Sequence, residues 1–155
     1  MEAKDILDRL VEKGWTLSAM ESLTGGLFAA SFTAIPGASQ AFKGSLVTYC
    51  DEAKEQFGVK KETISAHGAI SAECAEEMCL SAASLFQSDV SIAFTGNAGP
   101  SASEGKPVGL VYVAILVQDK ISCYRLDLQG DRKEIRRRLI DFAFHALDEK
   151  LAEIA

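Results

Sequence analysis

The sequence predicts one α/β domain, a three-layer α/β/α sandwich with a mixed sheet. Segments rich in β-branched and aromatic residues alternate with segments whose apolar residues recur every three or four positions, as in helices that cover a parallel sheet. Two apolar segments, 108–117 and 121–128, lie only three residues apart and indicate an antiparallel hairpin, which makes the sheet mixed. The length of 155 residues fits a single domain over 1–155.

The first half of the chain begins with a helix and a strand. Apolar residues at helical spacing predict a helix over 2–13, and a short strand follows over 15–21. We expect a second helix over 27–35, which Pro36-Gly37 ends. Residues 44–50 carry the β-branched and aromatic side chains of a second strand.

Two N-cap residues mark the helices that follow. Asp51 predicts a short helix over 52–57, and Ser71 predicts a longer one with an apolar face. Residues 90–95 are mostly apolar and should be a buried third strand. The strand precedes the part of the chain that is richest in glycine.

Residues 96–107 form a predicted loop of unusual length for so compact a domain, and such loops tend to be functional. The hairpin follows this loop. Asp131 and Glu134 then have the spacing of a capping box and predict the start of the last helix.

Composition and charge limit the function classes. A net charge of −6 argues against general nucleic-acid binding, which depends on clustered Lys and Arg. The one basic run, Arg136-Arg137-Arg138, is expected to form an exposed helix face balanced by Glu134 and Asp141. The longest apolar stretch, 108–117, is about half of a membrane span, and the N-terminus lacks a signal-peptide pattern. We expect no membrane partner and a cytoplasmic location.

The cysteine pattern argues against a metal centre. The four cysteines contain no C-x-x-C pair, and only His67 and His145 could complete a ligand set. We therefore expect reduced thiols and neither a metal nor another cofactor.

The first candidate site follows the first strand. In α/β sheets, ligands bind beyond the carboxyl ends of strands. Ser22 lies there, ahead of Thr24-Gly25-Gly26, so its hydroxyl should lie near unpaired backbone N–H groups that suit an oxyanion or a phosphate. The alternative is that Ser22 or Thr24 only caps the following helix.

The second candidate site follows the second strand. Lys54 lies in the first turn of the predicted helix, where a cation is disfavoured, so a partly desolvated Lys54 could act as a general base. The alternative is a solvated lysine paired with Asp51 or Glu55. Tyr49 could relay a proton or orient the nucleophile, or it could be a half-buried strand aromatic.

The loop that follows the third predicted strand does not match a known phosphate-binding motif. No G-x-G-x-x-G follows a strand. The stretch from Gly99 to Lys106 has five residues between its glycines instead of the four of a P-loop, and Pro107 stands where Ser or Thr would hold magnesium. A nucleotide would have to be bound in another way.

Taken together, these segments resemble the C-terminal domain of the competence-damage-inducible (CinA) family over about residues 3–150. The resemblance rests on six motifs in order: Glu21-Ser22-x-Thr24-Gly25-Gly26; Gly44 with Tyr49 and Lys54 ahead of Gly58-Val59; His67-Gly68-Ala69-x-Ser71; Thr95-Gly96-x-Ala98-Gly99-Pro100; Lys106-Pro107-Val108-Gly109; and Gly130-Asp131-Arg132. Stand-alone members of this family include nicotinamide-nucleotide amidases.

The resemblance implies metal-free hydrolysis of nicotinamide mononucleotide to nicotinic acid mononucleotide and ammonia. It implies Ser22 as nucleophile, Lys54 as base and Tyr49 as the third catalytic residue, in a homo-oligomer. N–H groups from Leu23 to Gly26 would hold the oxyanion. The residues expected to bind the substrate are Thr24, Gly25, Gly26, Gly96, Asn97, Gly99 and Arg132, with Lys106 a weaker candidate.

The sequence departs from the family pattern around the pocket. Asn97 and Cys50 stand where an apolar residue and a serine are usual, Phe57 stands where leucine is expected, and 101–105 is not rich in Asp and Gly. These departures concern substrate preference more than mechanism. Two alternatives stay open, a nucleotide-binding regulatory module without turnover and an amidase for a different nucleotide amide.

Overall fold

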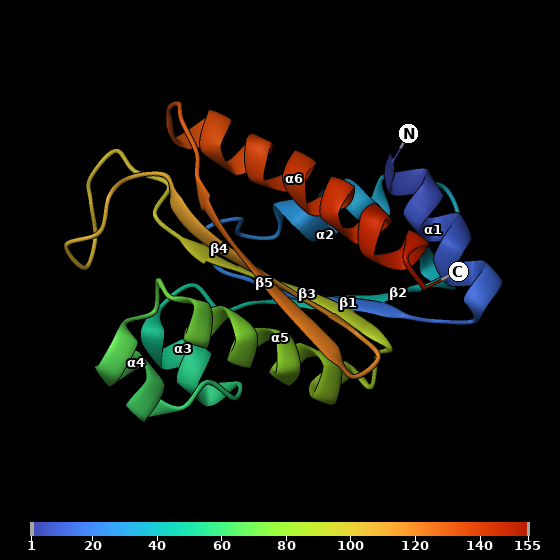
Figure 1. Ribbon diagram of the computed structural model, residues 1–155, viewed down its shortest axis with the longest axis horizontal. Coiled ribbons are helices and arrows are strands. Elements are labelled where there is room, and N and C mark those ends of the chain that lie inside the picture. Colours follow the sequence, from blue (N-terminus) through green and yellow to red (C-terminus); the bar gives the residue numbers. More distant parts are fainter. Residues whose placement is uncertain (1, 155) are drawn as a thin grey trace.

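The computed structural model describes residues 2–154, which form a five-stranded mixed sheet between two layers of helices (Figure 1). The strands lie in the order β2-β1-β3-β4-β5, with β2, β1 and β3 parallel and β4 and β5 antiparallel. Their bounds are β1 Leu17–Glu21, β2 Phe42–Val47, β3 Val90–Gly96, β4 Leu110–Val117 and β5 Lys120–Asp127. The predicted three-layer α/β/α sandwich with a mixed sheet is confirmed.

Three helices cover each face of the sheet (Figure 1). One layer contains α1 Glu2–Lys13, α2 Leu27–Thr33 and α6 Arg132–Ala152, and a short 3-10 turn, η1, spans Ala38–Gln40. The other contains α3 Asp51–Gln56, α4 Lys61–His67 and α5 Ala72–Phe86. Within residues 2–154, no helix combines the length and the apolar character that crossing a bilayer requires.

Each helical layer buries its own apolar cluster against the sheet. Phe28 and Phe32 of α2 pack with Phe94 of β3 on one side, and the Phe28 and Phe94 rings lie 5.4 Å apart. Met78 of α5 packs with Met20 of β1 on the other side. The central strands β1 and β3 are therefore covered on both faces, which explains why every residue of β1 and all of β3 up to Thr95 are buried, polar Ser18, Glu21 and Ser91 included.

Two predicted caps are confirmed and one is wrong. Ser71 Oγ accepts from Cys74 N at the start of α5, and Asp131 with Glu134 forms the capping box of α6. Asp51 is the first residue of α3 rather than its cap, because the extended backbone before the helix ends one residue earlier, at Cys50.

Two further differences affect the site. The second strand covers Phe42–Val47 instead of 44–50, so Tyr49 lies in the turn beyond it. Helix α4 has no counterpart in the sequence prediction, because tertiary contacts support it: Lys60 N and Thr63 Oγ1 both donate to the carboxylate of Glu77 on α5.

Candidate functional site

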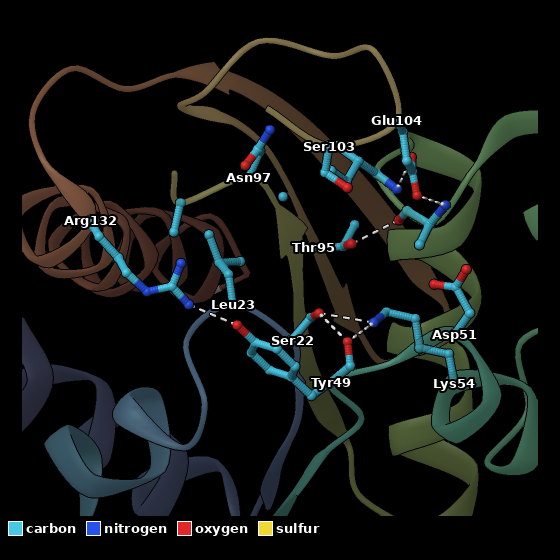
Figure 2. A pocket seen from close by; sticks show the side chains of 14 residues that line it. Ser22, Leu23, Tyr49, Asp51, Lys54, Thr95, Asn97, Ser103, Glu104 and Arg132 are labelled. Atoms are coloured by element: carbon cyan, nitrogen blue, oxygen red, sulfur yellow. Dashed lines mark hydrogen bonds between the residues drawn. The ribbon is translucent and has the colours of Figure 1, made fainter. Parts of the chain in front are cut away.

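A cavity of about 210 Å³ lies where the three parallel strands end (Figure 2). Parallel strands place their carboxyl ends at one edge of the sheet, so the turns after β1, β2 and β3 meet there. The start of α6 closes one side of the cavity. The lining residues used below are Ser22, Leu23, Tyr49, Asp51, Lys54, Thr95, Asn97, Glu104 and Arg132.

Ser22 and Lys54 are in contact at the floor of this cavity (Figure 2). Lys54 Nζ lies 2.9 Å from Ser22 Oγ, 2.7 Å from the carbonyl oxygen of Thr48 and 3.0 Å from that of Tyr49. The Lys54 side chain is only 1% exposed. The alternative of a solvated lysine is therefore wrong.

Burial is the main cause that lowers the pKa of Lys54 from its usual value, because it disfavours the ammonium form. The carboxylates of Asp51 and Glu104 act in the opposite direction without cancelling it. Burial, more than the position in the first helical turn, is therefore the main physical reason why Lys54 can be a neutral amine that accepts a proton.

The contacts of Lys54 suit both of its protonation states. An ammonium donates to Ser22 Oγ and to the carbonyls of Thr48 and Tyr49. A neutral amine keeps both carbonyls as acceptors and offers its lone pair to the Ser22 hydroxyl, which then becomes the donor. A proton can therefore move from Ser22 to Lys54 along this contact, as a nucleophile and its general base require, and Ser22 Oγ gives up only its longer, 3.5 Å donation to Tyr49 O.

Glu21, and neither Ser22 nor Thr24, satisfies the N-terminus of α2. Its fully buried carboxylate accepts from the N–H groups of Gly26, Phe28 and Ala29. The alternative that Ser22 or Thr24 only caps this helix is therefore wrong. The sequence left the role of Glu21 open because its contacts run five to eight residues along the chain.

The turn after β1 leaves two N–H groups next to Ser22. Gly25 N donates to Ser22 O at 3.0 Å, and Gly26 N donates to Glu21. Within residues 2–154, the N–H groups of Leu23 and Thr24 make no hydrogen bond. Of the predicted donors from Leu23 to Gly26, these two are the ones free to bind an oxyanion.

The carbonyl oxygen of Tyr49 accepts a hydrogen bond from Lys54, whereas its phenol lies apart from the serine–lysine pair and contacts Arg132. The side chain is 56% exposed at the mouth of the cavity, so it is not a half-buried strand aromatic. Its Oη accepts from Arg132 Nη2 at 2.7 Å, whereas Arg132 Nη1 donates to Gly99 O at 2.6 Å (Figure 2). The phenol makes no hydrogen bond to Ser22 or Lys54 through which it could relay a proton or orient the nucleophile.

The loop after β3 uses its polar groups internally. Asn97 is buried, its Oδ1 accepts from Gly99 N, and its Nδ2 donates to Lys106 O. Asn97 N donates to Leu110 O. The N–H groups of Asn97 and Gly99, two of the residues expected to bind the substrate, therefore already have partners. A Cβ at Gly96 would lie 2.7 Å from Leu110 O, so glycine lets the two strands approach here.

Glu104, which the sequence analysis did not single out, and Lys106, the weaker substrate-binding candidate, tie this loop to the turn before α5. Both carboxylate oxygens of Glu104 accept backbone N–H groups, from Ala69 and from Ile70. Lys106 Nζ donates to the carbonyls of His67 and Ile70. Burial opposes ionisation of Glu104, yet these N–H groups and Lys106 hold its pKa below the usual value. These contacts join residues 34 to 39 positions apart, so no local sequence pattern could predict them.

Arg136 is a further residue beside the site whose contacts the sequence did not reveal. Its Nε donates to Leu23 O at 3.0 Å, and its Nη2 donates to Thr24 O at 2.9 Å. The side chain is half-buried between α6 and the turn after β1. The interpretation of the basic run as an exposed face is therefore wrong for this residue, although Arg137 and Arg138 are exposed.

None of the four cysteines is among the residues that line the cavity. All four are free thiols, and burial raises the pKa of Cys74 and of Cys79 to about 12, which keeps both protonated. Within the described part of the chain, no group of three or more His, Cys, Asp or Glu side chains is placed to hold a metal ion.

Fold and site together define a three-layer α/β/α protein with a buried serine–lysine pair at the carboxyl edge of its parallel strands. The family model for the CinA C-terminal domain matches residues 2–151. The chain belongs to this family.

Related proteins and solved structures agree with this assignment. The chain is 46% identical to a CinA-like protein of Fervidobacterium nodosum over 92% of its own length, and 44% identical to one of Petrotoga mobilis over 90%. It spans only 35% of the length of each of these relatives.

The structural matches cover nearly whole chains. A CinA superfamily protein from Klebsiella pneumoniae superposes with a TM-score of 0.95 at 34% identity, over 98% of this chain and 96% of that one. The competence/damage inducible protein CihA from Agrobacterium tumefaciens gives a TM-score of 0.88 at 31% identity, with the same two coverages.

Proposed function

We propose that this protein is a serine amidase that hydrolyses the carboxamide of nicotinamide mononucleotide to nicotinic acid mononucleotide and ammonia. The observation that carries the proposal is the 2.9 Å contact between Ser22 Oγ and the buried amine of Lys54, whose pKa is lowered by burial. An unactivated serine is a weak nucleophile, and an adjacent base is the usual remedy.

The first half of the reaction acylates Ser22. Ser22 Oγ attacks the carboxamide carbon while its proton moves to Lys54 Nζ, and the N–H groups of Leu23 and Thr24 hold the oxyanion. Lys54 then gives the proton to the amide nitrogen, the C–N bond breaks, and ammonia leaves. An ester between Ser22 and the nicotinoyl group remains.

The second half restores the free enzyme. Lys54 takes a proton from water, the resulting hydroxide attacks the ester carbon, and the Ser22 alkoxide leaves and is reprotonated by Lys54. The same oxyanion donors serve both steps. Tyr49 supplies the carbonyl that orients Lys54, and its phenol lies at the mouth of the cavity with Arg132.

Arg132 is the group we propose for the substrate phosphate. It lies at the mouth of the cavity and lines it, and a guanidinium suits phosphate by charge and geometry. The chain carries a net charge of −6, so a local cation is needed to hold an anionic substrate. This location keeps the phosphate away from Ser22 and leaves the floor of the cavity for the amide.

The test is ammonia release from nicotinamide mononucleotide by the wild type and by Ser22→Ala. We expect Ser22→Ala to lose activity by about 10⁴-fold or more, because a nucleophile removed from a serine site leaves only binding and oxyanion stabilisation. Ser101→Ala changes an exposed serine of the loop after β3 that does not line the cavity, so it is the matched control and should keep its activity.

Each alternative has its own outcome in the same assay. Nucleotide binding with no ammonia above background would identify a binding module without turnover. Ammonia release from another pyridine or purine nucleotide, with none from nicotinamide mononucleotide, would identify a different substrate. Full activity in Ser22→Ala would refute the mechanism.

A further inference from the structure

We propose that Arg136 is a positioning residue that aims and polarises the oxyanion donors beside Ser22. The inference rests on the proposed function, because it assumes that Ser22 attacks a carbonyl group. It assigns a role to a side chain that touches neither Ser22 nor Lys54. Arg136 acts on the turn after β1 from the opposite side, through the carbonyl oxygens of Leu23 and Thr24.

Peptide planarity links the contact of Arg136 to the direction of an N–H group. The C=O of residue i and the N–H of residue i+1 belong to one planar trans peptide and point in opposite directions. Arg136 Nε holds Leu23 O at 3.0 Å, so it fixes the Thr24 N–H on the face of the turn away from α6. The same reasoning applies to the Leu23 N–H, because Gly25 N holds Ser22 O.

Arg136 also holds the next peptide of the turn. Its Nη2 donates to Thr24 O at 2.9 Å, and Leu27 N donates to the same oxygen at 2.8 Å. The three peptide groups from Ser22 to Gly25 are thus each held at the carbonyl oxygen. Such a turn cannot rotate its N–H groups away when charge develops, which is the condition for an effective oxyanion site.

The charge of Arg136 adds a second effect. A guanidinium that binds Leu23 O withdraws electron density from that peptide and makes the Thr24 N–H a stronger donor, as in other cooperative hydrogen-bond chains. Glu21 makes this contribution necessary. Its carboxylate already takes the Gly26, Phe28 and Ala29 N–H groups, which would otherwise supply positive potential to the site.

The experiment compares Arg136→Met, Arg136→Lys and Arg137→Met with the wild type. Arg137 lies one position further along α6 and is exposed, which makes its substitution the matched control. Two experiments are made on each variant. The first measures kcat and KM for nicotinamide mononucleotide. The second measures, by intact mass, the rate at which an alkyl fluorophosphonate labels Ser22. In the labelling step the Ser22 O–P bond forms, the P–F bond breaks, fluoride leaves, and Lys54 takes the serine proton.

We expect Arg136→Met to lower both kcat and the labelling rate by about 10- to 100-fold, somewhat less than the loss of an oxyanion donor itself. KM should stay within about twofold, because the ground state carries no oxyanion. Arg136→Lys keeps the charge but has a shorter side chain and a single nitrogen in place of the planar fork whose Nε and Nη2 reach the two carbonyls, so it should lose at least about threefold and less than Arg136→Met. Arg137→Met should match the wild type.

A labelling rate that is unchanged in the Arg136 variants would overturn the proposal and leave Arg136 as a purely structural contact. If Arg136→Met fails to fold, Arg136→Lys decides by the same criterion. A wild type that is labelled at Ser22 but releases no ammonia would refute the amidase function, while the labelling rates would still test Arg136.

Discussion

Replacement of Lys54 by Met tests the base most directly. Met has a similar length and no proton to transfer, so Lys54→Met removes the amine that lies 2.9 Å from Ser22 Oγ. General-base catalysis contributes about 10²–10⁴-fold, or about 3–5 kcal/mol of barrier. We therefore expect kcat/KM for ammonia release to fall by that factor. Lys61→Met, an exposed lysine at the start of α4, should leave kcat/KM unchanged.

The pH profile gives a second and independent readout of Lys54. Burial lowers the pKa of Lys54 below its usual value of 10.5, and only the neutral amine can accept the Ser22 proton. In the wild type, kcat/KM should therefore rise with pH through the lowered pKa and reach a plateau below pH 10.5. The reasoning fails if Lys54→Met keeps activity within about threefold of the wild type or retains the same ascending limb.

Three further substitutions test the cavity and its surroundings. Thr48 Oγ1 is buried without a hydrogen-bond partner among residues 2–154, so Thr48→Val should keep or raise the free energy of unfolding in urea, by up to about 1 kcal/mol. Thr95 Oγ1 donates to Ala69 O at 2.7 Å, so Thr95→Val should instead lose about 1–2 kcal/mol, and equal losses in both variants would contradict the structure. Arg132→Gln should raise KM for nicotinamide mononucleotide at least about tenfold but leave KM for the phosphate-free riboside unchanged, and an equal rise for both would place the phosphate elsewhere.

The sequence predicts the architecture from local patterns, but those patterns left a helix cap open for Ser22 and a solvated lysine open for Lys54, and it was the family resemblance that implied a catalytic pair. Alternation of strands and helices places Ser22 and Lys54 after parallel strands, and parallel strands end at one edge. Their direct contact is beyond such reasoning. It depends on the burial of Lys54 beneath the turn that contains Tyr49, and burial arises from packing across the sheet.

The remaining site residues were missed where a side chain acts across the fold. Arg136 contacts carbonyls 112 and 113 residues away in sequence, and nothing in the basic run distinguishes it from Arg137. The phenol of Tyr49 was expected to serve the nucleophile and its base. The strand ends at Val47, however, so Tyr49 lies in the turn beyond it, where its phenol accepts a hydrogen bond from Arg132. Helix periodicity predicts on which face of a helix a side chain lies, but it does not predict which groups of the rest of the fold pack against that face.

The distribution of charge explains why the proposed reaction and the proposed phosphate site are separate. A helix start after a strand would ordinarily attract an anion, yet Glu21 already places a carboxylate at the N-terminus of α2. A substrate phosphate at that point would face a buried negative charge without compensation. The phosphate is therefore directed to Arg132 at the mouth, and the turn beside Ser22 keeps two neutral N–H donors for the charge that forms only during the reaction.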